Sequence, residues 1–335
     1  MKPLAVSMGD PAGIGLELAA RVWAERAGAP PFFLVGDPDA FERASARIGA
    51  PAPKLNIVTD AAKLSHGADT LSVLHVPLAI EETPGEPNPV NAEPIITAIE
   101  QGVAAVRANA ASALVTLPIA KALLHTADFG FPGHTEFIAH LTAADRWPHA
   151  RGPVMMLAGP SLKVALATIH TPLTQVPALL TRERIIHVGR VVAEALQRDY
   201  GIASPRIALC GLNPHAGEEG NIGREEIEII DPAAATLRAE GWQISNARSA
   251  DALFHDAARK SYDAVIALYH DQGLIPIKTL HFWDAVNVTL GLPIIRTSPD
   301  HGTGFDIAGR SIARADSFRA ALTLAAQMAE RRARA

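Results

Sequence analysis

Short apolar runs alternate with helix-like segments along most of the chain, and this alternation constrains the fold more than any other feature. Runs with the length and β-branched content of buried strands are Leu4–Ser7, Phe32–Val35, Leu114–Leu117, Val154–Leu157, Val164–Ile169, Ile207–Cys210 and Val265–Tyr269. Helical periodicity is found in Leu16–Arg26, Ile95–Asn109, Arg184–Arg198, Glu225–Glu240 and Asp316–Arg332. The alternation predicts an α/β protein with a largely parallel sheet.

The composition is that of an ordinary globular enzyme. A length of 335 residues, with 48% hydrophobic and 19% charged residues, suggests two domains or one large one. Apolar runs fall short of the ~18 residues that span a membrane, and the start M-K-P-L-A-V-S-M-G-D does not resemble a signal peptide. The single cysteine, Cys210, and a net charge of −5 favour a cytoplasmic protein without nucleic-acid or membrane partners.

Three of the apolar runs end at a histidine: V-A-L-A-T-I-H at His170, I-A-L-C-G-L-N-P-H at His215 and A-V-I-A-L-Y-H at His270. The carboxyl ends of parallel strands are where α/β proteins bind ligands. Each histidine alone is more often structural than metal-ligating, but together the three favour a metal site. Three protein ligands with an open position are typical of a catalytic metal. Asp251 could add an oxygen ligand, and Asp271 could orient His270 or cap a helix.

The first strand runs into M-G-D-P-A-G-I-G, with Gly9, Gly13 and Gly15, and not into the G-x-G-x-x-G of common nicotinamide enzymes. Glycines there allow the backbone to approach a phosphate, or they allow a tight turn against a close neighbour. The spacing alone favours neither interpretation.

Several further motifs place polar groups at turns. In F-P-G-H-T-E, Thr135 either caps the following helix or binds an anionic substrate together with His134. Surface lysines are usually solvated, so Lys121 and Lys278 carry little weight alone. Arg296 closes an apolar run and therefore requires an anionic partner.

The loop D-H-G-T-G-F-D-I-A-G-R, residues 300–310, is the second strong signal. Its small residues surround His301 and Asp306. Such a loop can hold an adenosine, with the imidazole against the base, the aspartate on ribose hydroxyls and glycine amides near phosphate.

These motifs together resemble the 4-hydroxythreonine-4-phosphate dehydrogenase family of vitamin B6 biosynthesis. The resemblance covers essentially the whole chain and is most specific in P-G-H-T-E, C-G-L-N-P-H-A-G-E, Y-H-D-Q-G-L-x-P-x-K, N-x-T-L-G-L-P-x-x-R-T-S and D-H-G-T. The segment H-G-T-G-F-D-I-A-G is also similar to the adenosine-binding loop of isopropylmalate and isocitrate dehydrogenases, which lack the Rossmann fingerprint.

The resemblance implies a two-domain α/β/α sandwich of the isocitrate/isopropylmalate dehydrogenase-like type. We expect a nucleotide-side domain at residues 1–130 plus 298–335, and a metal, substrate and dimerisation domain at residues 131–297. The family forms a homodimer with an active site at the domain cleft and dimer interface. One of the three metal-ligand histidines is therefore expected to come from the partner chain.

Residue by residue, the resemblance assigns three groups of positions. The metal ligands are His170, His215 and His270, for one divalent ion per subunit such as zinc, magnesium or cobalt. The substrate-binding residues are His134, Thr135, Lys278, Asn287 and Arg296. The NAD or NADP site is assigned to His301, Gly302, Thr303, Gly304, Asp306 and Gly309, and Lys121 is a candidate to take the alcohol proton.

The implied reaction is oxidation of the 3-hydroxyl of 4-phosphooxy-L-threonine by NAD(P)⁺. The β-keto acid product, 2-amino-3-oxo-4-phosphooxybutanoate, then loses CO₂ to give 3-amino-2-oxopropyl phosphate. Relatives that oxidise 4-phospho-D-threonate or 4-phospho-D-erythronate carry the same motifs. A metal-dependent hydrolase or lyase would use the same histidines but would not need the His301–Gly309 loop, and a non-catalytic nucleotide-binding module would not need the convergent polar groups.

Overall fold

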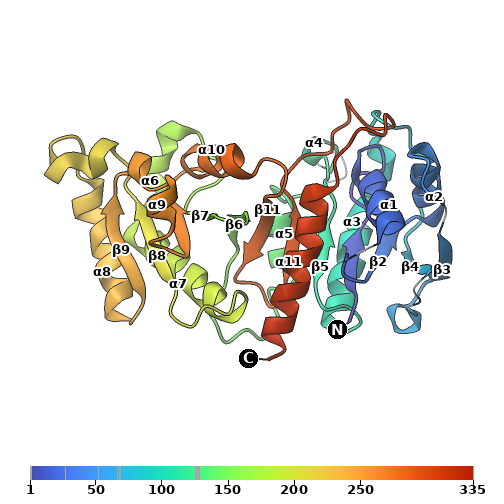
Figure 1. Ribbon diagram of the computed structural model, residues 1–335, viewed down its shortest axis with the longest axis horizontal. Helices are drawn as coiled ribbons and strands as arrows, with labels where there is room; N and C mark the ends of the chain where they lie inside the picture. Colours follow the sequence, from blue (N-terminus) through green and yellow to red (C-terminus); the bar gives the residue numbers. More distant parts are fainter. Residues whose placement is uncertain are drawn as a thin grey trace. The chain divides into compact units, whose positions relative to one another are not determined.

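The computed structural model describes residues 2–26, 28–51, 53–65, 67, 69–124 and 129–334. The chain divides into two compact units (Figure 1). Unit 1 comprises Met1–Asp145 and Pro293–Glu330, and unit 2 comprises Arg146–Leu292 and Arg331–Ala335. These boundaries differ from the expected ones after residues 130 and 297. The residues at 131–145 stay in unit 1 because the helix they form packs on another helix of that unit, and the strand that begins at Arg296 pairs with a unit 1 strand.

Unit 1 is built on a parallel sheet. The strand order is β3 (Lys54–Val58), β4 (Thr70–His75), β2 (Phe32–Gly36), β1 (Leu4–Ser7), β5 (Leu114–Thr116) and β12 (Arg296–Pro299). The helices of unit 1 are α1 (Gly15–Glu25), α2 (Pro38–Arg47), α3 (Ala92–Arg107), α4 (Lys121–Leu124), α5 (His134–Leu141) and most of α11 (Asp316–Arg332). Helix α3 packs against β1, β2 and β5.

Unit 2 has a mixed sheet. The order is β11 (Val286–Leu290), β6 (Val154–Ala158), β7 (Lys163–Leu166), β10 (Ala264–Ala267), β8 (Arg206–Cys210) and β9 (Gln243–Arg248). The pairs β11–β6 and β6–β7 are antiparallel, and the remaining pairs are parallel. The helices of unit 2 are α6 (Val176–Leu179), α7 (Arg182–Arg198), α8 (Asp231–Ala239), α9 (Asp256–Arg259) and α10 (His270–His281).

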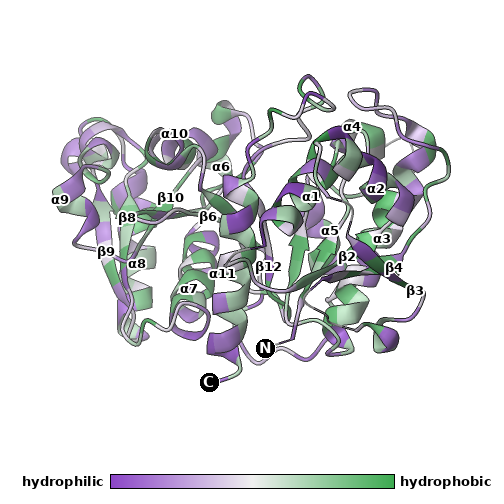
Figure 2. Ribbon diagram, turned by 45° about the vertical axis from the view of Figure 1, so that its right-hand side comes forward, coloured by the Kyte–Doolittle hydropathy of each residue, from purple (hydrophilic) through white to green (hydrophobic). Residues whose placement is uncertain are grey.

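Apolar strands form the core of each unit. Strands β1, β2, β6 and β10 are buried at every position, which explains their continuous apolar sequence. In Figure 2 the strands are mostly green, whereas helices such as α7 and α11 show both colours, as amphipathic elements do. In the described part of the chain, no helix is long and apolar enough to cross a membrane.

The predicted fold class, α/β with a largely parallel sheet, is confirmed. The predicted strands beginning at Leu4, Phe32, Leu114 and Val154 match β1, β2, β5 and β6 to within a residue or so at their ends. The tail helix has the bounds that its sequence predicts, Asp316–Arg332. These elements were predicted from their apolar residues, and those residues are the ones that they bury.

Candidate active site

Two of the histidines lie side by side at the carboxyl edge of the unit 2 sheet. His170 follows β7, and His270 follows β10 and opens α10; the two strands are parallel neighbours. The ring centroids of His170 and His270 are 5.9 Å apart. The Nδ1 atom of His270 lies 2.8 Å from an oxygen of Asp271, so Asp271 orients the ring, while the helix N-cap position is held by Tyr269. Asp271 is therefore not the N-cap of α10, which was the alternative role expected for it.

His215 stands in a turn of unusual backbone conformation after β8. His215, Ala216, Glu218 and Glu219 all have positive φ angles, a conformation that costs free energy for residues with a side chain. Buried Glu226 stabilises the turn. Its Oε1 accepts hydrogen bonds from the backbone N–H groups of Leu212 at 2.7 Å and Asn213 at 2.8 Å. The strained turn is therefore built into the fold of the chain.

Asp251 belongs with His215 rather than with the other two histidines. A hydrogen bond from Ser249 and, among smaller contributions, the charge of His215 lower the pKa of Asp251. Within the described ranges, no three His, Cys, Asp or Glu side chains are close enough together to hold one metal ion. A single chain thus presents the pair His170 and His270, and separately His215 beside Asp251.

A buried cationic side chain lies in unit 1. Arg296, at the start of β12, is 2% exposed, and its Nε and Nη2 atoms donate to Oγ1 of Thr116 at 3.2 and 2.7 Å. Burial lowers the pKa of Arg296 to about 10, with nearby Glu136 acting in the opposite direction. The guanidinium therefore stays charged at neutral pH in a site poor in water, which favours an anionic ligand.

His134 lies beside this guanidinium. Burial, and then the charges of Arg296 and Lys121, hold the pKa of His134 well below its usual range. The imidazole is therefore neutral at physiological pH, and its buried Nε2 has no hydrogen-bond partner in the described part of the chain. Lys121 lies over Gly133, where an added Cβ would be 3.1 Å from the lysine Cε. An N-cap hydrogen bond from Thr135 is not formed, because α5 begins at His134 with Gly133 at the N-cap.

The other expected substrate residues, Lys278 and Asn287, belong to unit 2. Lys278 is on α10, with its Nζ 5.9 Å from the ring centroid of Phe282. Asn287 is on β11, and its Oδ1 is buried with no hydrogen-bond partner among the described residues. An amide oxygen in that position is available to a ligand.

The loop at residues 300–310 is fastened to the first strand-to-helix turn. Ile14 donates its N–H to the carbonyl of Thr303 at 2.9 Å, and Gly309 donates to Oε1 of Glu17 at 2.5 Å. An added Cβ on Gly13 would lie 2.7 Å from the Thr303 carbonyl oxygen. The glycines of the first turn therefore serve close packing of neighbouring chain segments. Asp306 is exposed on the loop surface.

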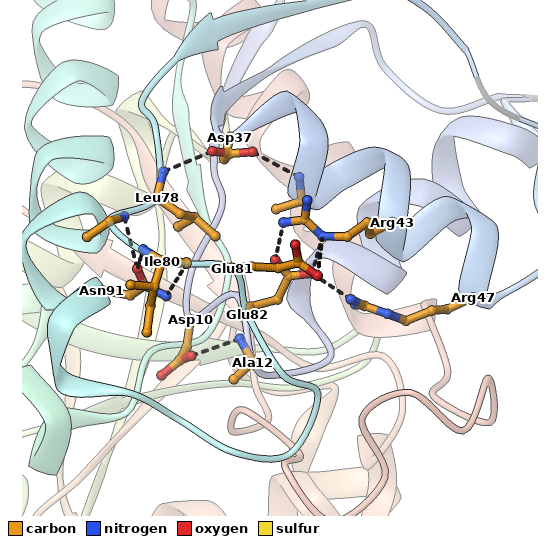
Figure 3. A network of polar contacts seen from close by, with 12 residues as sticks. Asp10, Ala12, Asp37, Arg43, Arg47, Leu78, Ile80, Glu81, Glu82 and Asn91 are labelled. Carbon is orange, nitrogen blue, oxygen red and sulfur yellow. Dashed lines mark hydrogen bonds and ion pairs between the residues drawn. The ribbon is translucent and has the colours of Figure 1, made fainter.

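A third segment, residues 76–91, also contacts the first strand-to-helix turn, and a polar network holds this segment in place (Figure 3). Glu82 forms ion pairs with Arg43 at 2.5 Å and Arg47 at 2.6 Å. Asn91 accepts from the N–H of Ile80 and donates to its carbonyl. Burial would raise the pKa of Glu82, but hydrogen bonds from the two arginines outweigh it and the pKa is lowered. The network fixes the segment whose Gly85 donates to the Ala12 carbonyl.

Sequence reasoning missed the groups that hold the site residues in place. Thr116 begins the run T-L-P-I-A-K that leads to Lys121, and Glu226 stands in the charged run E-E-I-E-I-I. A polar residue within an otherwise apolar strand or helix face was the available signal for each.

Comparison with known proteins decides the family. The family model described as "Pyridoxal phosphate biosynthetic protein PdxA" matches residues 29–325. The chain belongs to the PdxA family. Its relatives include proteins named 4-hydroxythreonine-4-phosphate dehydrogenase from Caulobacter vibrioides, 54% identical over 99% of this chain and 98% of that protein, and from Maricaulis maris, 51% identical over 99% of both.

Solved PdxA-type structures have the same fold. The 4-hydroxythreonine-4-phosphate dehydrogenase of Klebsiella pneumoniae is 38% identical with a TM-score of 0.87, covering 98% of this chain and all of that one. A terephthalate 1,2-cis-dihydrodiol dehydrogenase of Burkholderia xenovorans is 29% identical with a TM-score of 0.64, covering 97% of this chain and 98% of that one. This PdxA-family chain therefore shares its fold with dehydrogenases whose names give different substrates.

Proposed function

We propose that this PdxA-family protein is a 4-hydroxythreonine-4-phosphate dehydrogenase. It oxidises the 3-hydroxyl of 4-phosphooxy-L-threonine, and the resulting 2-amino-3-oxo-4-phosphooxybutanoate decarboxylates to 3-amino-2-oxopropyl phosphate in pyridoxal phosphate biosynthesis. The full-length similarity to proteins of that name, 54% over 99% of the chain, carries the proposal. We place the enzyme in the cytoplasm, where its biosynthetic relatives would act.

The anionic ends of such a substrate match the polar groups of the chain. The buried Arg296, fixed by Thr116, and the neutral His134 with its free Nε2 form a pocket suited to a phosphate or a carboxylate. Lys278, Asn287 and Thr135 are the further substrate-binding residues in the proposal. Lys121, beside His134, is the candidate to take the hydroxyl proton when the C3–H bond is broken.

The histidines fit a divalent metal in their donor chemistry. Neutral imidazoles suit zinc or cobalt, and a hydrogen bond donated by Nδ1 of His270 to the carboxylate of Asp271 is of the kind that orients metal-bound histidines. A bound ion would act as a Lewis acid on the substrate hydroxyl and the later ketone. His170 and His270 would bind it from one protomer, and His215 of the partner subunit would complete the set.

A homodimer would account for this division, and the exposed apolar surface of α10 supports the proposal. Its Ile275 is 65% exposed and Leu280 42%, and the following Phe282 and Trp283 are 62% and 51% exposed. An apolar surface next to His270 and Lys278 is suited to burial against a second copy. We propose that the partner covers this surface and brings His215 and Asp251 to the paired histidines.

NAD or NADP would accept the hydride from C3 of the substrate. We assign the adenosine end to the loop His301–Gly309, with Asp306 on the ribose, and the exposure of Asp306 is compatible with that role. The loop is rigidly fixed by Glu17 and Ile14, which is what pre-organised binding requires.

The experiment is a substrate panel. Purified protein is incubated with NAD⁺ or NADP⁺, a divalent metal, and in turn 4-phosphooxy-L-threonine, 4-phospho-D-threonate and 4-phospho-D-erythronate, and reduced nicotinamide is followed at 340 nm. We expect turnover with 4-phosphooxy-L-threonine. Turnover with the threonate or erythronate alone would contradict the substrate assignment, and phosphate release without reduction of the dinucleotide would favour a hydrolase.

A further inference from the structure

Asp10 occupies the topological switch point of the unit 1 sheet. From β1 the chain passes through α1 to β2 on one side, whereas β5 lies on the other side of β1. Loops leaving two such strands diverge, and open α/β sheets bind ligands in the crevice that results. Asp10 follows β1 and donates its N–H to the carbonyl of Pro118, which follows β5, at 2.8 Å. The residue therefore spans the point where a ligand is expected.

The carboxyl group of Asp10 is only half satisfied. Its Oδ1 accepts from the N–H of Ala12 at 3.0 Å, but its buried Oδ2 has no hydrogen-bond partner within the described residues. The residue is 2% exposed, and burial raises the pKa of Asp10 to about 6. In Figure 3 its second oxygen points away from the other side chains drawn. A buried acceptor without a donor is costly, and a ligand that supplies a donor would remove this cost.

The backbone contacts of this turn connect it to both halves of the proposed chemistry. On one side, Ile14 donates to Thr303 of the loop assigned to the dinucleotide. On the other side, Pro118 leads into α4 with Lys121, beside His134. A dinucleotide with its adenosine on the loop of Thr303 and its reactive ring facing Lys121 would run along the turn that contains Asp10.

We propose that Oδ2 of Asp10 accepts a hydrogen bond from the carboxamide NH₂ of the nicotinamide ring. This rests on the proposed function, because it requires a nicotinamide dinucleotide. Phosphates and carboxylates offer only acceptors and would be repelled, whereas the carboxamide offers a neutral donor at the reactive end of the cofactor. The contact would select the ring face presented to the substrate, which makes Asp10 a positioning residue for hydride transfer.

The test is calorimetric binding of two dinucleotides, NAD⁺ and 3-acetylpyridine adenine dinucleotide, in which a methyl group replaces the amino group. We expect wild-type protein to bind NAD⁺ at least about tenfold more tightly, as loss of a hydrogen bond to a charged acceptor predicts. In Asp10→Asn the preference should disappear. The preference for NAD⁺ should also disappear in Asp10→Ser, whose hydroxyl can still accept a hydrogen bond from the N–H of Ala12. The second variant keeps the test valid if the first one folds poorly.

Asp37→Asn is the matched control. Asp37 ends β2 as Asp10 ends β1, but both of its oxygens are already paired, with the N–H groups of Ala40 and Leu78, each at 2.9 Å. This variant should keep the preference for NAD⁺ even if its melting temperature falls. An unchanged preference in both Asp10 variants, or equal affinities in the wild type, would overturn the inference alone. Absence of binding of either dinucleotide by the wild type would overturn the proposed function together with it.

Discussion

At the scale of single residues, the site depends on side chains whose own partners are fixed by the fold. The guanidinium of Arg296 is buried, and its Nε and Nη2 atoms both donate to the hydroxyl of Thr116. A donor group held in this way is pre-organised for an anion and cannot rotate away from it. If Arg296 binds the phosphorylated substrate as proposed, we expect the affinity to depend on Thr116, which does not itself need to contact the substrate.

Thr116→Val removes that acceptor while keeping the β-branched shape. We expect the KM for the phosphorylated substrate to rise about tenfold, with a smaller effect on kcat, since loss of one hydrogen bond to a charged group is worth about 1.5–3 kcal/mol. Initial rates at varied substrate concentration measure this. Thr297→Val is the control, because Thr297 is equally buried but donates to the carbonyl of Ala321. Equal KM values for the two variants would contradict the role of Thr116.

The neutral state of His134 predicts a pH dependence of stability. Its pKa in the folded protein lies well below the ordinary value of 6.5, so the unfolded chain binds a proton more readily. The stabilisation is present above pH 6.5 and is lost as the pH falls below it. Thermal unfolding of wild type and His134→Asn between pH 5 and 8 should show a wild-type advantage that shrinks with acidity. A constant difference across this range would argue against a neutral buried imidazole.

The sequence predicted where the three histidines lie better than it predicted the residues that hold the neighbouring segments in place. The three histidines follow apolar runs, so their positions at strand ends could be read from the pattern, and β7, β8 and β10 place them there. Thr116 and Glu226 escaped notice because their importance arises from tertiary contacts. Thr116 accepts hydrogen bonds from Arg296, which is distant in the sequence, and Glu226 accepts from the N–H groups at residues 212–213, just before the strained turn at residues 215–219. Whether the assigned residues bind substrate, cofactor and metal remains a prediction.

At the scale of elements, the hydrophobic pattern of the sequence failed to predict a polar strand, β12, and a helix that contains glycine and proline, α10. Strand β12 reads R-T-S-P yet is buried throughout, because its hydroxyls and guanidinium bond within unit 1. Helix α10 contains Gly273 and Pro276, which predict a turn. Gly273 is tolerated because any Cβ there would come within 2.6 Å of Val164 on β7, so the helix packs closely on the strand. Such reasons depend on tertiary contacts.

The ion pairs of Glu82 are expected to stabilise the segment at residues 76–91 against α2. Glu82→Gln should lower the free energy of unfolding by about 2 kcal/mol at neutral pH, because it leaves two partly buried arginines without their anion. The pKa of Glu82 is lowered in the folded state, so this difference should be present above pH 4.5 and should vanish as the pH falls further. Urea unfolding measures it.

Glu81→Gln is the matched control for this prediction. Glu81 is next in the chain, and its carboxylate lies 4.0 Å from Arg43, but its side chain is 73% exposed. An exposed pair contributes little, so the control should change stability by less than about 0.5 kcal/mol. If the two variants lost equal stability, the buried network would not be what holds the segment.

At the scale of the whole molecule, the division of the histidines makes the dimer part of the proposed catalytic unit. One chain pairs His170 with His270 and holds His215 apart with Asp251. His270→Ala and His215→Ala homodimers should both be inactive. Refolding an equal mixture of the two should restore about a quarter of wild-type activity, since half the dimers are mixed and each of these has one intact site. No restoration would mean that all three histidines act within one chain.

In the proposed reaction, the protein couples oxidation of 4-phosphooxy-L-threonine to decarboxylation. The most direct measurement is the yield of reduced nicotinamide and of CO₂ in the same reaction, with and without a chelator. We expect equal amounts of both products, and none of either once the divalent metal has been removed. CO₂ without reduced nicotinamide, or undiminished turnover in the presence of the chelator, would contradict it.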